Sequence, residues 1–347
     1  MRIGQVITAS VGGIGRHVAS VVTRLVQRGH AVRIYGPVRT VRAHGLDDLG
    51  ADIFPLGRLP RLAGADVVHA HGYKAGALAA PVCRLRGLPL TVTWHNAVLG
   101  SGWQARAGRL LQILVARSAE LTLGASSDLV VEAQRLGARD ARLAPVAAPV
   151  LGVPELPRED QRREFGVSDG DVMILTASRL APQKNLGLVL DIARAVRYRP
   201  ELFFVIAGDG PQRKELAERA RAEGSRVRLI GHRDDIASLL AAADLALLTS
   251  TWEARALVAQ EALLAGVPLI STRVGGIEEL VGDAAALFDR GDTEQAVAKL
   301  LELAESPGRR AALRAAGLAR AANWPDEDQV VEELVAMYRE LAGSIDV

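Results

Sequence analysis

The chain has 347 residues, of which 49% are hydrophobic and 24% charged. Domains usually contain about 100–200 residues, so this length predicts about two domains with packed cores and excludes a largely disordered chain. The formal net charge is +2, from 42 basic and 40 acidic residues, and aromatic residues make up 4%. This balance argues against nucleic acid as a partner, and so few aromatic residues argue against stacking platforms for single strands.

Cys83 is the single cysteine, so no disulfide can form within the chain and a metal site built from cysteines is excluded. A reducing compartment fits best, and we expect a cytoplasmic protein. The N-terminus, MRIGQVITASVGGIG, has too short an apolar run and too much glycine for a signal peptide. No uninterrupted apolar stretch reaches about 18 residues, so we expect no helix that spans a membrane.

Short β-branched runs alternate with longer helical patterns in the first half of the chain. We expect a strand over Arg2–Ala9 and a helix over Gly15–Arg28. Further strands are expected over Ala31–Gly36, Asp66–Ala70, Leu90–Trp94 and Glu120–Gly124. Strands that alternate with helices predict a parallel sheet covered by helices on both faces, and near-continuous apolar runs are typical of its buried strands.

Four prolines without helical periodicity and a charged run mark a boundary between two halves. We predict an N-terminal domain over 1–150, a linker over 151–164 and a C-terminal domain over 165–325. Beyond the linker the expected strands are Val172–Ser178, Leu202–Ala207, Val227–Ile230, Asp244–Leu248, Pro268–Ser271 and Ala285–Phe288. The expected helices are Leu186–Val196, Gln212–Glu223, Thr293–Ala304, Gly308–Ala322 and Asp326–Leu341. The fold class is therefore α/β, with two Rossmann-like parallel-sheet domains and ligands at the carboxyl ends of the strands, in a cleft between them.

A glycine-rich segment, Gly12–Gly15, follows the first expected strand and opens a helix. Backbone N–H groups and the helix dipole favour an anion at such a point. The pattern is not GxGxxG, and no acidic residue follows at the spacing that holds an NAD ribose. A plain tight turn explains the segment equally well.

Two cations flank the loop that follows the first strand of the second half. Arg179 leaves the end of that strand, and Lys184 lies five positions later at the start of the next helix. A bidentate guanidinium and a compact ammonium are complementary ligands for a diphosphate. Ordinary surface charge is the alternative for Lys184, but the chain contains only four lysines, so its place in this loop favours function.

Two glutamates stand eight residues apart around the start of another helix. Glu253 follows an expected strand, and Glu261 lies inside the helix that comes next, about 12 Å further along its axis. The helix N-terminus between them suits a phosphate. Either glutamate alone is explained by a surface or capping role, and only the spacing indicates a ligand site. Two glycine turns, Gly208–Pro211 and Val274–Glu279, also follow strands, and the first needs no ligand to explain it.

The segment Gln104–Arg117 reads as a helix that mixes arginines with leucines, isoleucine and valine. It fits two descriptions: a helix packed on the first sheet with a solvated basic edge, or a peripheral contact with an anionic membrane surface. The second would place the protein at the inner face of a membrane.

The second half closely resembles the retaining glycosyltransferases of family 4, which have the GT-B fold. The matching stretches, in the family's order from about Leu175 to Tyr338, are ASRLAPQKN, IAGDGPQ, VRLIGH, LLTSTWEARALVAQEALLAGVPLISTRVGGIEELV and ANWPDEDQVVEELVAMY. The first half matches more loosely through VGGIGRHV, RGHAV, DVVHAHG and TWHN. The resemblance implies two domains that close around the donor, with a C-terminal helix over 326–347 that packs back on the N-terminal domain.

The resemblance also implies roles on the donor side. Arg179 and Lys184 would bind the donor diphosphate and stabilise the leaving nucleotide, so neither a divalent metal nor another cofactor is expected. Glu253 would contact the transferred sugar, and Glu261 would hold the ribose hydroxyls. Backbone around Ile230 would surround the base.

Two residues of the first half complete the implied site. Gly13 would approach the phosphates or the sugar, and His95, in TWHN, would face the donor sugar and the acceptor. A histidine satisfied by hydrogen bonds at a strand end is the alternative for His95. His69 and His71 are expected to be structural.

One segment departs from the family. Where the family usually has a glycine-rich EGFGL-type sequence, this chain has Glu253 followed by Ala254, Arg255, Ala256 and Leu257. The freedom of glycine to adopt positive φ is lost there. Arg255, Ala256 and Leu257 are still expected beside the donor, and Arg255 would add a phosphate contact or alter the choice of sugar.

Together these features favour a metal-independent, retaining hexosyltransferase that uses a nucleotide-diphosphate sugar and an unidentified acceptor, such as a glycolipid, a polysaccharide or a small metabolite. Two alternatives stay open. One is a sugar-nucleotide epimerase or hydrolase on the same fold. The other is a catalytically weak sugar-nucleotide-binding partner protein, suggested by the altered 254–256 segment.

Overall fold

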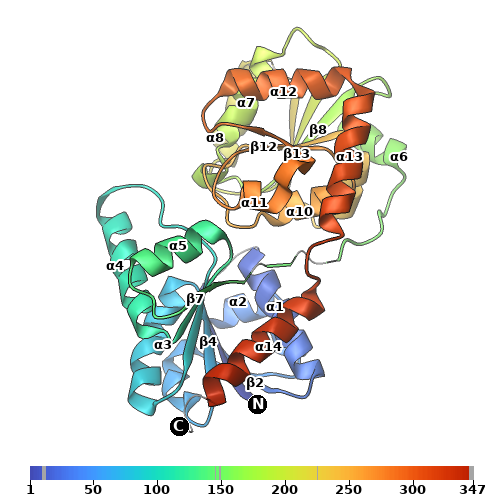
Figure 1. Cartoon of the computed structure of the whole chain (residues 1–347). Helices are drawn as coiled ribbons and strands as arrows, with labels where there is room; N and C mark the ends of the chain where they lie inside the picture. Colours follow the sequence, from blue (N-terminus) through green and yellow to red (C-terminus); the bar gives the residue numbers. More distant parts are fainter. Residues whose placement is uncertain (10–12, 145, 148–149, 225, 344–347) are drawn as a thin grey trace. The chain divides into compact units, whose positions relative to one another are not determined.

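The computed structural model describes residues 1–9, 13–144, 146–147, 150–224 and 226–343 (Figure 1). The chain divides into two compact units, which we call the N-terminal domain (Met1–Pro149 with Pro325–Val347) and the C-terminal domain (Val150–Trp324). Each is built around its own parallel sheet. The expected two-sheet α/β architecture is confirmed.

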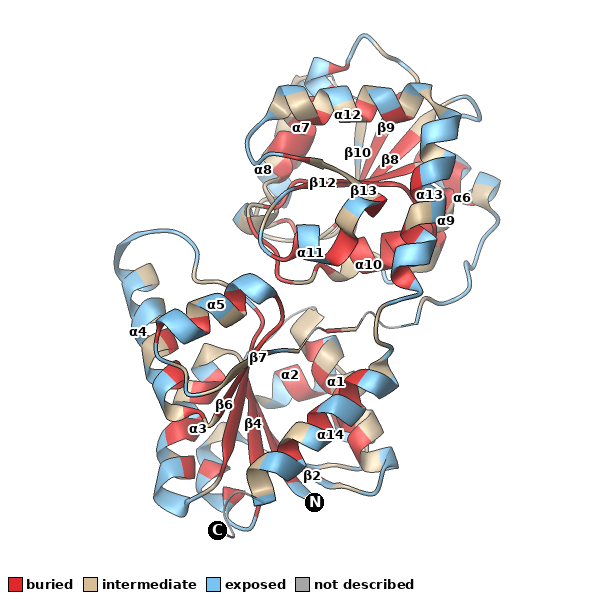
Figure 2. Cartoon of the chain, in the orientation of Figure 1, coloured by how far each residue is buried: buried red, intermediate tan, exposed pale blue. Residues whose placement is uncertain are grey.

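The N-terminal domain contains a seven-stranded sheet in the order β3-β2-β1-β4-β5-β6-β7, and all of its neighbouring strands are parallel. The central strands β4 and β5 are buried along their whole length, and Figure 2 shows β4 in red. The strands are β1 (Arg2–Ile7), β2 (Ala31–Tyr35), β3 (Asp52–Phe54), β4 (Val67–His71), β5 (Leu90–Trp94), β6 (Leu121–Gly124) and β7 (Ala141–Leu143). Two-sided burial is why these strands read as apolar runs in the sequence.

Helices cover this sheet, and the C-terminal helix α14 is one of them. The helices are α1 (Gly13–Gln27), α2 (Val38–Ala43), α3 (Tyr73–Arg86), α4 (Gly102–Ser118), α5 (Ser127–Arg135) and α14 (Glu327–Gly343), with 3₁₀ turns η1 (Leu46–Asp48) and η2 (Leu56–Leu62). Helix α14 packs against α1: Val331 and Leu334 share one apolar core with Val18 and Leu25. An ion pair joins Arg28 to Asp328 at 2.8 Å. Helix α14 is therefore part of the N-terminal domain's core.

The C-terminal domain contains a six-stranded parallel sheet in the order β10-β9-β8-β11-β12-β13. Its strands are β8 (Val172–Ala177), β9 (Leu202–Ala207), β10 (Val227–Gly231), β11 (Leu245–Leu248), β12 (Leu269–Thr272) and β13 (Ala285–Phe288). Its helices are α6 (Arg158–Phe165), α7 (Leu186–Ala195), α8 (Arg213–Ala222), α9 (Ile236–Ala242), α10 (Leu257–Leu264), α11 (Ile277–Val281), α12 (Thr293–Glu305) and α13 (Pro307–Ala321), with 3₁₀ turns η3 (Pro182–Lys184) and η4 (Gly282–Ala284). The strand order reverses at β8, and β8 and β11 lie side by side there.

The predicted linker is wrong over 158–164, because these residues form α6 and belong to the C-terminal domain. The segment has almost no apolar periodicity, and polar contacts hold it instead. Arg158 and Arg162 bind the Asp244 carboxylate at 2.6 and 2.9 Å. Phe165 is buried in the domain core, and Gly166 ends the helix at a φ of 73°. Such contacts with a distant residue leave no periodic signal in the local sequence.

Candidate functional site

Two loops at the carboxyl ends of β8 and β11 are joined by hydrogen bonds. The first runs through η3 and Asn185, and the second spans 249–253. The Thr251 N–H donates to the Gln183 carbonyl at 2.8 Å, and the Gln183 amide donates to the Trp252 carbonyl at 2.9 Å. The Thr249 hydroxyl donates to the Lys184 carbonyl at 3.0 Å. Residues about 65–70 positions apart in the chain are thereby fixed against each other.

This loop pair brings together two of the predicted site residues, Lys184 and Glu253. The Lys184 Nζ atom lies 2.5 Å from Glu253 Oε1, and the Ser250 hydroxyl donates to the same oxygen at 2.5 Å. The two side chains are only 19% and 9% exposed. A charge-assisted bond with so little water around it fixes both groups in position, and removal of either partner leaves the other charge partly buried.

A glycine turn supports the backbone of Glu253 from the side of β12. The Gly276 N–H donates to the Glu253 carbonyl at 2.9 Å. Gly275 has a φ of 52°, and a Cβ atom there would lie 2.0 Å from the Glu253 carbonyl oxygen. The second glycine turn of the sequence therefore has a steric function: it lets one loop approach the other.

We expect Gly275→Ala to lower the melting temperature of the protein by about 4–8 °C more than Gly291→Ala does, which corresponds to about 2 kcal/mol of overpacking. Both glycines have positive φ, but a Cβ at Gly291 meets nothing within 4 Å among the described residues, so the control isolates the overlap. Thermal unfolding followed by circular dichroism measures the difference. Equal melting temperatures for the two variants would show that the 275–276 turn tolerates a side chain.

Helix α10 begins directly after the segment that departs from the family. Ala256 is its N-cap residue with a φ of −65°, and Leu257 is its first residue. Among the non-glycine residues that the structure describes, Asn185 alone has positive φ. The 254–256 segment thus needs no glycine conformation. Glu261, about one turn into α10, is buried at 4% exposure.

Arg255 packs within its own domain. Its Nε donates to the Gln260 side chain at 3.2 Å, and its guanidinium lies 5.5 Å from the centre of the Trp324 ring. Burial lowers its pKa to about 10. Within the described part of the chain its Nη2 atom has no hydrogen-bond partner. The predicted phosphate contact of Arg255 is untested by these contacts and stays a prediction.

Arg179 and Ile230 lie at the ends of β8 and β10. Arg179 is exposed just beyond β8, and Ile230 is half-buried in β10 against the domain core. The glycines of the 208–211 turn are explained by packing, because a Cβ at Gly208 would lie 1.8 Å from the Ser178 carbonyl oxygen. The Leu180 N–H donates to the Asp209 carbonyl at 2.9 Å. This turn sets the path of the loop that carries Arg179. It agrees with the expectation that the 208–211 glycines need no ligand to explain them.

The N-terminal domain holds the remaining predicted residues. Gly13 is the first residue of α1, and Gly12 of the same glycine-rich segment lies outside the described residues. His95 follows β5 and is 8% exposed. Its Nε2 atom lies 3.4 Å from His71 Nδ1, and His17 of α1 completes a cluster with them. Burial lowers the pKa of all three imidazoles, to about 4 for His17, so they are neutral near pH 7.

His69 differs from this cluster although it is only two positions from His71. Its Nδ1 atom bonds the Tyr338 hydroxyl and its Nε2 atom bonds the Thr93 hydroxyl at 2.6 Å. Both ring nitrogens are thus occupied by protein groups, which fits the structural role expected for His69. His17 lies in the matching stretch VGGIGRHV, but the sequence analysis assigned it no role, because its partners come from other segments of the chain.

Two protein-family models match this chain, one in each half. A family model described as "Glycosyl transferases group 1" matches residues 157–320, and one described as "Glycosyl transferase 4-like domain" matches residues 12–149. The chain belongs to the group 1 glycosyltransferases. The resemblance to family 4 is thereby confirmed, and the first model contains the whole Lys184–Glu253 loop pair.

Two curated relatives illustrate the range of this glycosyltransferase family. An N-acetyl-α-D-glucosaminyl L-malate synthase of Bacillus anthracis is 33% identical over 41% of this chain, but the match spans only 38% of that relative's length. A D-inositol 3-phosphate glycosyltransferase of Catenulispora acidiphila is 27% identical over 97% of this chain and 83% of its own length.

A solved structure confirms the fold of the glycosyltransferase. The HepE protein of Anabaena, crystallised in complex with UDP, superimposes with a TM-score of 0.85 at 19% sequence identity, over 98% of this chain and 100% of that one. Two Rossmann-like parallel-sheet domains of this kind form the GT-B fold. At this identity the likeness shows the fold alone.

Proposed function

We propose that the chain transfers a hexose-type sugar from a nucleotide-diphosphate sugar to an acceptor with retention of the anomeric configuration, and that it needs no divalent metal or other cofactor. The observation that carries the proposal is the Lys184–Glu253 contact at the carboxyl ends of two adjacent parallel strands. Ligands of open α/β sheets bind at this edge, next to the point where the strand order reverses. The Lys184 ammonium suits the diphosphate of a donor, and the Glu253 carboxylate beside it suits the hydroxyl groups of a sugar.

The chemistry follows from charge. As the glycosidic bond to the diphosphate breaks, negative charge grows on the leaving phosphate and positive charge on the sugar ring. Two cationic side chains, Lys184 and the exposed Arg179, would donate hydrogen bonds to the leaving phosphate. The N-terminus of α10 is the positive end of a helix dipole and would stabilise the same charge. Because these groups already lie in place, the proposal needs no metal ion to neutralise the phosphate. The leaving phosphate itself would help to deprotonate the acceptor during front-face attack.

The other predicted residues have supporting roles in this proposal. Glu253 would contact the sugar, and Glu261 would hold the ribose through its buried carboxylate. Ile230 would lie beside the base, and Leu257 and Ala256 would present the backbone of α10 to the phosphate. In the N-terminal domain, Gly13 would approach the donor and His95 would face the sugar and the acceptor.

A panel of nucleotide sugars tests the proposal. The Anabaena neighbour was crystallised with UDP-glucose, and a relative of Corynebacterium glutamicum is named as GDP-mannose-dependent, so the panel should include both bases. A cognate donor raises the melting temperature, because it binds the native state alone. Transfer with retained stereochemistry in a product assay is the expected result. Release of free sugar or of an epimerised nucleotide sugar would favour an epimerase or hydrolase, and tight binding without turnover would favour a binding partner protein.

Helix α4 supports a peripheral membrane contact and hence a lipid-linked acceptor. In the described part of the chain no helix is long and apolar enough to cross a bilayer. Trp103, Leu110 and Leu114 of α4 are 76%, 68% and 48% exposed, and Arg106 and Arg109 are exposed on the same helix. Apolar side chains interspersed with arginines are typical of a helix that lies on anionic lipid.

We expect the double substitution Trp103→Ala and Leu110→Ala to weaken binding to phosphatidylglycerol vesicles at least tenfold, since each buried apolar side chain contributes about 1.5–3 kcal/mol. Co-sedimentation measures the affinity. Leu85→Ala is the matched control, because Leu85 on α3 is 82% exposed in the same domain. Equal binding of all variants, or no binding of the parent chain, would leave α4 as a surface helix packed on the sheet.

A further inference from the structure

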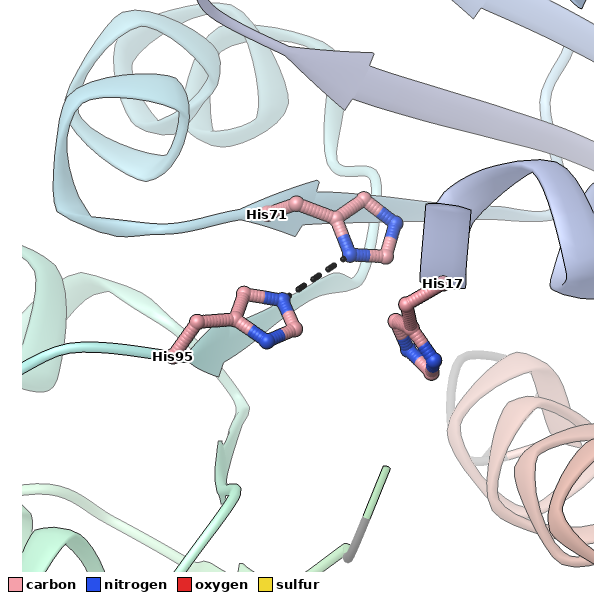
Figure 3. A group of neighbouring side chains, drawn as sticks. All are labelled: His17, His71 and His95. Carbon is pink, nitrogen blue, oxygen red and sulfur yellow. Dashed lines mark hydrogen bonds between the residues drawn. The ribbon is translucent and has the colours of Figure 1, made fainter. Parts of the chain in front are cut away.

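Three imidazoles from separate elements of the N-terminal domain lie close together (Figure 3). His17 comes from the second turn of α1, His71 ends β4, and His95 follows β5. One nitrogen of each ring lies within 4.8 Å of the other two. Because β4 and β5 are adjacent and α1 follows β1 on the other side of β4, the sheet itself brings these residues to one edge.

His71 and His95 share a hydrogen bond whose length matches the spacing of two nitrogen ligands on one metal ion. His71 Nδ1 and His95 Nε2 lie 3.4 Å apart. Two nitrogens bound to a tetrahedral zinc at about 2.0–2.1 Å are separated by about 3.4 Å. The opposite nitrogen of His71, Nε2, lies 2.7 Å from Gln5 Oε1, so it carries the ring proton and donates to the amide oxygen. The lone pair of His71 Nδ1 is therefore directed at His95.

This outer contact is the one that metal-binding histidines need. A ligating imidazole usually donates its second N–H to a fixed oxygen, which sets the tautomer and the orientation of the ring. Gln5 supplies that oxygen from β1, and both Gln5 and His71 are buried. His69 shows the opposite arrangement on the same strand, since both of its nitrogens bond protein hydroxyls.

We propose that His17, His71 and His95 form a binding site for a divalent transition metal ion of the zinc class. Three imidazoles bind zinc and leave one coordination position open, whereas magnesium and calcium prefer oxygen ligands, and the cluster contains no carboxylate. His17 is half-buried in the second turn of α1. Glu333 of α14 lines the same small pocket as His17.

The site has a consequence for transfer that rests on the proposed function. His95 is the residue expected to face the donor sugar and the acceptor, and a bound metal would occupy its Nε2 atom. The metal site is thus inhibitory: zinc withdraws His95 from the reaction, and removal of zinc restores it. This role differs from that of a catalytic metal at the diphosphate, which the proposed mechanism does not use.

Direct metal binding tests the site without any activity. The tag-free full chain, freed of metal by a chelator, is titrated with Zn²⁺ against a chromophoric competitor, and with Co²⁺ for the strong visible absorption of a tetrahedral site. We expect one ion per chain, and at least tenfold weaker binding for His17→Gln and for His71→Asn. His232→Gln is the control, because His232 is exposed in the other domain and should bind zinc as the parent does. His17→Gln changes a half-buried residue, and its melting curve verifies that the fold is kept.

Two results would overturn the site: parent-like zinc affinity in His17→Gln, or no stoichiometric binding to the parent chain. The inhibitory role is measured separately, as the ratio of transfer rates with and without micromolar zinc in each variant. Zinc should slow transfer by the parent chain, and this inhibition should be at least tenfold weaker in His17→Gln. If no donor supports transfer but zinc binds, the proposed function fails and the site stands. If transfer occurs and zinc does not bind, only the site fails.

Discussion

Lys184→Ala is expected to lower the rate of sugar transfer by about 10²–10³-fold while the protein stays folded, because one preorganised donor to the developing phosphate charge contributes about that factor. Lys184 is held within 2.5 Å of Glu253 and is 19% exposed, so water cannot replace its charge at low energetic cost. Steady-state rates with the cognate donor, together with the melting temperature, separate lost chemistry from lost fold. The effect should lie in kcat more than in KM, since the charge grows in the transition state.

Two further variants sharpen this result. Lys214→Ala removes a lysine of the same domain whose side chain is 88% exposed, and it should leave the rate within twofold of the parent. Lys184→Arg keeps the charge but replaces a compact ammonium with a planar fork, so we expect partial activity. If Lys184→Ala kept parent-like rates with the same donor, the lysine would be a structural partner of Glu253 and the proposed donor site would be wrong.

The sequence predicts the fold well because buried parallel strands leave an apolar run that needs no partner to be recognised. Strands β4 and β5 begin within one residue of their expected positions and end within one. The edge strands β3 and β7 were missed, since each has three residues and is only half-buried. Helix α6 was taken as part of a linker because its stabilising contacts reach Asp244, about 80 positions away.

The site could be predicted only in part, for a similar reason. Lys184 and Glu253 each follow a strand in the sequence, but their contact depends on β8 and β11 being neighbours, which local patterns do not encode. The family's sequence suggested that residues 254–256 need the positive φ of glycine. Ala256 has a negative φ, so no glycine is needed at that residue. The place of His17 in the cluster cannot be predicted locally, because His71 and His95 lie at the ends of β4 and β5 and only the folded sheet brings the three rings together.

Glu253→Gln separates the chemical role of the carboxylate from its structural one. The substitution keeps the shape and one acceptor for the Ser250 hydroxyl, but it leaves Lys184 partly buried without its counter-charge. We expect the free energy of unfolding to fall by about 3 kcal/mol, at the low end of the range for a broken buried pair because Lys184 keeps some exposure. We also expect transfer to fall by about 10²-fold or more, because the interaction with the sugar loses its charge.

The double variant Lys184→Met with Glu253→Gln decides between the two roles. With both charges gone, no unpaired charge remains buried, so stability should recover to within about 1 kcal/mol of the parent. Activity should stay as low as in the worse single variant, since donor binding and sugar contact are both lost. Urea unfolding and transfer rates on the parent, Lys184→Met, Glu253→Gln and the double variant complete the cycle. If activity recovered together with stability, the pair would only hold together the loops after β8 and β11. The proposal that Lys184 and Glu253 contact the donor would then be wrong.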